Sequence, residues 1–169
     1  MNHILSKLLL ISLIMILNVC VFAADLSLGS DTKPPGETAV IPVTISNDLD
    51  SVNMVCFTVN SGTTLPAPAA VKGTDQANIL PEYCFVDDFG GGSYRITAFI
   101  TTLPNIAAGS GDAIHLEFDL TGIPEAIYPL TVTSAEIYDV SNANVTGATS
   151  GGSITVDESS EVKDWMLIQ

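Results

Sequence analysis

The sequence predicts an all-β protein, an antiparallel β-sandwich of about eight or nine short strands. Apolar and polar residues alternate repeatedly between residues 25 and 156, so that every second side chain lies on the same face of a strand. Clusters of glycine, proline and asparagine interrupt the alternation at regular spacing, as turns between strands do. No window in this range has the period of about 3.6 residues that marks an amphipathic helix.

The strands follow from the alternation and its interruptions. Pro42 suits a strand edge, a strand start or a bulge, because it cannot donate a backbone hydrogen bond. Residues 60–78 are rich in glycine, proline, alanine and threonine and are expected to form a loop. Residues 89–93 are a glycine-rich turn, which predicts a hairpin between the strands on either side. The expected strands are residues 26–28, 40–45, 53–59, 83–88, 94–101, 113–120, 128–132, 137–138 and 154–156.

The same alternation predicts which side chains enter the core. Three strands have one clearly apolar face, and these faces are expected to be buried. The predicted core residues are Val55, Phe57 and Val59; Tyr94, Ile96, Ala98 and Ile100; and Ile114, Leu116, Phe118 and Leu120.

Residues 1–24 are expected to be a secretory signal peptide, which makes the mature protein extracellular, either secreted or attached to the cell surface. Lys7 supplies a positive start, residues 8–21 are almost entirely apolar, and small residues allow cleavage after Ala23 or one residue later. The apolar run is too short to serve as a membrane span. A lipoprotein anchored through Cys20 is the alternative, although the residues before that cysteine lack the expected small side chains.

Residues 25–156 are expected to form one domain, followed by an acidic tail at residues 157–169, to which we assign no function. This length is sufficient for one sandwich with a core and leaves no room for a second domain. The chain carries a formal net charge of −14. A surface of this kind repels nucleic acid and anionic lipid, so neither a nucleic-acid partner nor membrane insertion after signal cleavage is expected.

Two cysteines remain after signal cleavage, Cys56 and Cys84. In an oxidising environment an even number of cysteines favours a disulfide, so a bond between them is predicted. Cys56 alternates with the predicted core residues, so such a bond must run along the outer face or at an irregular strand end. Two buried thiols are the alternative. No metal site is expected, because His115 is the single histidine outside the signal peptide.

No constellation of residues indicates an enzyme or a bound cofactor. Asp87 and Asp88 are adjacent on a strand and point to opposite faces, whereas a glycosidase holds two carboxylates across its substrate. His115 has no nucleophile motif to accompany it. Residues 139–144 place oxygen ligands at alternate positions, but they lack the glycine and glutamate of a calcium loop and predict a turn capped by aspartate and asparagine side chains instead. We therefore expect no catalytic residues.

Four segments, in order, resemble the cohesin domains of cellulosomal scaffoldins over residues 25–156. The segment PGETAVIPVTI at residues 35–45 is similar to the family's opening P-G-D-T-V-x-V-P-V-x-L, and GDAIHLEFDL at residues 111–120 to G-x-L-A-x-I-x-F-x-V. Further along, YPLTV at residues 128–132 and GGSITV at residues 151–156 resemble the closing strands. The family's Tyr-Asp-Pro turn after residue 59 is replaced by NSGT.

This resemblance implies a jelly-roll β-sandwich of nine strands. It also implies a non-catalytic module that docks a dockerin-type protein partner in extracellular polysaccharide-degrading assemblies. The same superfamily contains carbohydrate-binding modules, so a polysaccharide ligand is one alternative, and a structural or adhesive surface domain is another. The sequence shows no outward aromatic strip, and Trp165, the one tryptophan, lies in the tail, which disfavours carbohydrate binding.

The resemblance also implies that the partner binds one sheet face, built from residues 53–59, 94–101 and 113–120. The outward residues of these segments follow from alternation, and Arg95 and Phe99 are the expected energetic anchors. The predicted partner-binding residues are Met54, Thr58, Arg95, Thr97, Phe99, His115, Glu117 and Asp119.

Overall fold

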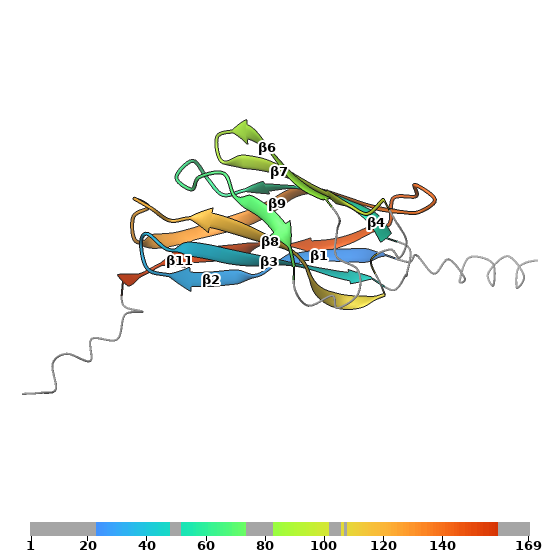
Figure 1. Ribbon diagram of the computed structural model, residues 1–169, viewed down its shortest axis with the longest axis horizontal. Helices are drawn as coiled ribbons and strands as arrows, with labels where there is room; N and C mark the ends of the chain where they lie inside the picture. Colours follow the sequence, from blue (N-terminus) through green and yellow to red (C-terminus); the bar gives the residue numbers. More distant parts are fainter. Residues whose placement is uncertain (1–22, 48–51, 74–82, 102–105, 107, 159–169) are drawn as a thin grey trace, which may run out of the picture.

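The computed structural model describes residues 23–47, 52–73, 83–101, 106 and 108–158. Within these ranges the chain forms eleven strands arranged in two layers (Figure 1). No helix in the described ranges is long and apolar enough to cross a bilayer. Most of the expected signal peptide and of the acidic tail lies outside the described residues. The strands are β1 (Ala24–Leu28), β2 (Ser30–Lys33), β3 (Thr38–Asn47), β4 (Val52–Asn60), β5 (Ala69–Lys72), β6 (Tyr83–Gly90), β7 (Ser93–Phe99), β8 (Gly109–Asp119), β9 (Ala126–Asp139), β10 (Thr146–Ser150) and β11 (Gly152–Val156).

The strands form two sheets that face each other. One sheet has five strands in the order β10-β1-β3-β8-β5, and the other has six in the order β2-β11-β9-β4-β7-β6. The pairings are antiparallel except those of β1 with β10 and of β2 with β11, which are parallel. The predicted all-β sandwich is therefore confirmed, with two mixed sheets in place of purely antiparallel ones.

The first and last strands change sheets, which accounts for two of the additional strands. β1 and β2 are separated by Gly29, and β10 and β11 by Gly151, so each pair contributes to both sheets. The two crossing points are in close backbone contact, because a Cβ atom on Gly152 would overlap the carbonyl oxygen of Gly29. Only glycine allows the two chains to approach so closely there.

Pro42 lies inside the five-stranded sheet, where a proline is normally excluded. The Gly29 N–H donates to the Pro42 carbonyl oxygen at 2.8 Å, so the nitrogen of Pro42 also faces the side of β1. The last residue pair between β1 and β3 is Leu28 with Val43, because β1 ends at Leu28. The missing N–H of Pro42 therefore faces a place where the neighbouring strand has already left the sheet.

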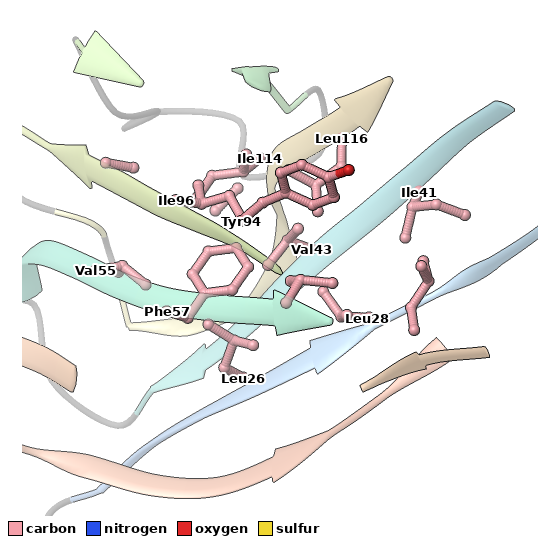
Figure 2. Packing of buried hydrophobic residues seen from close by; sticks show 14 of the residues in the cluster. Leu26, Leu28, Ile41, Val43, Val55, Phe57, Tyr94, Ile96, Ile114 and Leu116 are labelled. Carbon is pink, nitrogen blue, oxygen red and sulfur yellow. The ribbon is translucent and has the colours of Figure 1, made fainter. Parts of the chain in front are cut away.

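The core lies between the two sheets, and every predicted core residue is buried in it. The largest of the fully buried side chains are Phe57 from β4 and Phe118 from β8, one from each sheet. Figure 2 shows side chains of both sheets pointing into this shared space. The labelled residues there are Leu26, Leu28, Ile41, Val43, Val55, Phe57, Tyr94, Ile96, Ile114 and Leu116.

The predicted hairpin joins β6 and β7 through consecutive glycines with positive φ angles. Its end packs against the turn after β4, where the Ser61 N–H donates to the Gly92 carbonyl oxygen at 2.9 Å. The loop expected at residues 60–78 contains a short edge strand, β5, that was not predicted from the sequence. The hydroxyl of Tyr94, on β7, donates to the carbonyl oxygen of Leu65 in that loop at 3.0 Å, which holds the loop over the core.

Candidate functional site

The eight residues predicted to form one partner-binding face lie on two different sheets. β4 and β7 are neighbours in the six-stranded sheet, whereas β8 pairs with β3 and β5 in the other sheet. The prediction of a single face was wrong, because alternation shows which side chains point outward but not from which sheet. The residues brought together on the six-stranded sheet are Met54, Thr58, Arg95, Thr97 and Phe99; those on the five-stranded sheet are His115, Glu117 and Asp119.

The outer surface of β6, β7, β4 and β9 is the larger candidate site, and we call it the four-strand face. Strand register places its side chains in three rows that run across the sheet. The rows are Tyr83, Phe99, Met54 and Tyr138; Phe85, Thr97, Cys56 and Glu136; and Asp87, Arg95, Thr58 and Ser134.

Three aromatic rings gather at one end of the four-strand face, and we call them the aromatic cluster. The ring centroid of Phe99 lies 5.1 Å from that of Tyr83 and 5.9 Å from that of Phe85. Tyr83 is 47% exposed and Phe85 is 51% exposed, although both are large and apolar. Phe99 was placed outward by the alternation, but no outward aromatic strip was predicted from the sequence, so the cluster was missed. The predicted hairpin could have revealed it, since pairing across the glycine turn brings Tyr83 opposite Phe99.

Arg95 is held in place next to the cluster. Its Nε atom donates to the Cys56 Sγ atom at 2.9 Å, and the Thr97 hydroxyl lies 3.6 Å from the same sulfur. The hydrogen bond to Cys56 and the negative charges of Glu136 and Asp87 raise the pKa of Arg95 above its usual value. The hydrogen bond from Nε therefore restrains this exposed, positively charged side chain before any partner arrives.

Cys56 and Cys84 form no disulfide, so the predicted bond is wrong. Cys56 pairs with Thr97 and points outward, whereas Cys84 pairs with the buried Ala98 and points inward. The two sulfurs therefore lie on opposite faces of the sheet, with β7 between their strands. A disulfide needs Cβ atoms about 4 Å apart that point toward each other, which this arrangement does not allow.

A shallow hollow of about 310 Å³ adjoins the aromatic cluster. Its apolar lining residues are Met54, Phe99 and Ile100, and two asparagines complete the lining, Asn53 from β4 and Asn142 from the turn after β9. Phe99 belongs to both features, so the hollow continues the exposed apolar surface of the cluster. Neither amide is hydrogen-bonded to another side chain in the described part of the protein.

The turn at residues 139–144 carries one wall of this hollow, and it is a turn closed by its own side chains, as predicted. The Asp139 carboxylate oxygen Oδ1 accepts hydrogen bonds from the Ser141 N–H, the Ser141 hydroxyl and the Ala143 N–H at 2.7–2.9 Å. Asn142, at the end of the turn, has a φ of 61°, which asparagine tolerates better than most residues. The carboxylate thus faces donors from its own turn.

The titration of Asp139 should report the order of this turn. The Ser141 hydroxyl and then the Ala143 N–H lower the pKa of Asp139 below the ordinary aspartate value. Because the pKa of Asp139 is lower in the folded than in the unfolded protein, its ionised carboxylate stabilises the turn at pH values above the unfolded pKa. That contribution is lost as the pH falls through the folded pKa. In an NMR titration, we expect the amide signals of Ser141 and Ala143 to move with a midpoint below about pH 3.9. Asp139→Asn should abolish the transition, and a midpoint at or above that pH would contradict the described hydrogen bonds.

The remaining candidate residues do not assemble into a reactive site. His115 Nε2 lies 4.0 Å from Asp112 Oδ2, and the Thr44 hydroxyl donates to Asp112 at 2.8 Å on the outer face of the five-stranded sheet. Asp119 accepts the Thr121 N–H at 2.9 Å, and the Thr121 hydroxyl and then this N–H lower the pKa of Asp119. Asp88 accepts the Gly90 N–H at the hairpin, so it has a local structural role. Among the described residues, no three His, Cys, Asp or Glu side chains could together hold a metal ion.

These features define a β-sandwich with one exposed sheet face as its candidate binding surface, and solved structures with the same fold are cohesin domains. CaCohA2 of Clostridium acetobutylicum aligns with a TM-score of 0.67 and 25% identity over 82% of this chain and 93% of that one. The sixth cohesin of Acetivibrio cellulolyticus scaffoldin B, in complex with a Cel5 dockerin, aligns with a TM-score of 0.66 and 16% identity over 80% and 99%.

A non-cellulosomal cohesin from the archaeon Archaeoglobus fulgidus aligns with a TM-score of 0.61 and 20% identity over 80% of this chain and 91% of that one. The resemblance to cohesins seen in the sequence motifs is therefore confirmed for the fold. No family model and no curated protein matches the chain.

Proposed function

We propose that the protein is a non-catalytic module that binds a dockerin-type protein partner through the four-strand face. The observation that carries this proposal is the exposed aromatic cluster beside the restrained guanidinium of Arg95. Aromatic and arginine side chains provide most of the energy at protein interfaces, particularly where they are ordered before binding. The solved cohesin–dockerin complexes of the same fold support this choice of partner.

A protein partner fits the aromatic cluster better than a polysaccharide. Sugar rings stack on flat aromatic faces that are free to receive them. In the cluster, the ring planes of Phe99 and its neighbours lie within 24–26° of parallel and the centroids are 5.1–5.9 Å apart, which is an offset-stacked arrangement. The rings therefore pack against one another, and the exposed surface is compact and apolar. Such a surface suits the centre of a protein interface.

Binding to a panel of purified dockerin modules, measured by isothermal titration calorimetry, tests the proposal. For a dockerin that binds, Phe99→Ala and Arg95→Ala should each weaken the affinity at least tenfold, about 1.4 kcal/mol, because they remove the cluster's centre and its restrained cation. His115→Ala is the matched control on the opposite sheet and should leave the affinity unchanged.

Two outcomes would redirect the assignment. If all three variants bind with the affinity of the wild type, the interface does not lie on the four-strand face. Binding to insoluble polysaccharide, with no response to any dockerin, would favour the carbohydrate-binding alternative.

The proposed role also requires export from the cell. We propose that residues 1–24 are removed and that the mature protein is secreted or held at the cell surface. The positive start and the apolar run before Ala23 support this proposal. N-terminal sequencing of the exported protein should give a chain that begins at Ala24 or Asp25, whereas an intact Met1 would rule out cleavage.

A further inference from the structure

The hollow beside the aromatic cluster has a lining that selects for one kind of side chain. Its volume of about 310 Å³ is at the lower end of the range for ligand sites, which suits one long side chain better than a whole small molecule. Met54, Phe99 and Ile100 provide an apolar wall, and two asparagines, Asn53 and Asn142, complete the lining. We propose that this hollow receives an arginine or lysine side chain of the docked partner, a proposal that rests on the proposed function.

The apolar wall and the amides together disfavour a purely aliphatic occupant. An aliphatic side chain would remove water from the Asn53 and Asn142 amides without replacing its hydrogen bonds, and each buried unpaired polar group costs about 1–3 kcal/mol. Arginine and lysine have long apolar stems that pack against such a wall, and their charged ends donate hydrogen bonds. The amide oxygens of the two asparagines can accept them.

The charge around the hollow selects a cation. The chain has a net charge of −14. Tyr138 pairs with Met54, which lines the hollow, and the negative charge of Glu136, two residues earlier on β9, raises the pKa of Tyr138. The positive charge of Arg95 lies in the row of Thr58 rather than in that of Met54, and its Nε atom is hydrogen-bonded to Cys56. A cation in the hollow would also lie near the ring of Phe99, whose face attracts positive charge.

The turn that supplies Asn142 is already ordered. Three hydrogen bonds to the Asp139 carboxylate hold it, so the backbone at Asn142 does not have to be ordered when the partner binds. Its φ of 61° also determines the substitution that tests its side chain. Glycine adopts this φ without strain, so Asn142→Gly removes the amide and keeps the turn, whereas alanine would strain the backbone.

NMR titration of the isotope-labelled protein with blocked amino acids tests the hollow directly. The probes are Nα-acetyl-arginine methylamide and Nα-acetyl-norleucine methylamide, which share a linear stem and differ in charge. The arginine probe should produce saturable shifts of the Asn53 and Asn142 side-chain amide signals, with an affinity at least fivefold above that of the norleucine probe. Asn142→Gly should lower the affinity for the arginine probe at least threefold. Ser134→Ala, in the row farthest from the hollow, should leave that affinity unchanged.

The outcomes separate this proposal from the proposed function. Equal shifts with both probes, or no saturable shift, would overturn the cationic occupant even if a dockerin binds the four-strand face. Saturable arginine binding without any dockerin binding would overturn the proposed function alone. Where a dockerin does bind, Asn142→Gly should weaken it at least threefold at low salt, and an unchanged affinity would count against the hollow as a contact.

Discussion

Replacing Gly92 by alanine is expected to destabilise the protein by at least about 3 kcal/mol. A Cβ atom at this position would overlap the carbonyl oxygen of Gly62, which is backbone and cannot rotate away. The φ of Gly92 is 77°, which adds strain of about 1–2 kcal/mol for any residue with a Cβ atom. To relieve the overlap, the β6–β7 hairpin must move away from the turn after β4 and lose the hydrogen bond from Ser61.

Gly91→Ala is the matched control. Gly91 has a φ of 64°, but a Cβ atom there would meet nothing within 4 Å. We therefore expect a loss of only about 1–2 kcal/mol from backbone strain. Chemical denaturation of both variants separates the two contributions, and similar losses would mean that the hairpin does not pack on the turn as described.

Replacing Phe57 by alanine is expected to destabilise the protein by about 3–5 kcal/mol. Phe57 is 1% exposed and packs between the two sheets, so its removal loses buried apolar surface and leaves a cavity (Figure 2). The loss would be a large part of the total stability of a domain of this size, about 5–15 kcal/mol. Urea denaturation at a fixed temperature measures it.

The same substitution at Phe85 provides the control. Phe85 is 51% exposed on the four-strand face, and its contacts are with the rings of Tyr83 and Phe99. Phe85→Ala should therefore cost about 1 kcal/mol or less. A loss as large as that of Phe57→Ala would show that the aromatic cluster is part of the folding core, and the cluster would then be a poor candidate for a binding surface.

The strands with one apolar face were predictable because alternation records burial directly. Val55, Phe57 and Val59 are buried as expected, and the same holds for the inward residues of β7 and β8. Sheet membership was not predictable from alternation, because each of the two sheets has its own outer face. That is why His115 was grouped with Arg95, although these residues lie on different sheets.

Register explains the other differences between prediction and structure. No register could be assigned over the expected loop at residues 60–78, so the presence of β5 was missed. The direction of Cys84 was missed because the hairpin was not paired residue by residue. Had the hairpin been paired across Gly90–Gly92, Cys84 would have faced the core and Tyr83 would have faced Phe99. The hollow depends on the turn that supplies Asn142, and no local pattern indicates that this turn reaches the end of β7.

The parallel pairing of the first and last strands determines how the domain would bear a mechanical load. Ala24, at the start of β1, pairs with Thr146, and Val156, at the end of β11, pairs with Lys33, so the described strands begin and finish at opposite ends of the sandwich. Tension applied between these two residues would slide the paired strands along each other. The ladder hydrogen bonds then resist together, whereas tension across a hairpin would open them one after another. A module attached by both ends would therefore keep the four-strand face intact while under load.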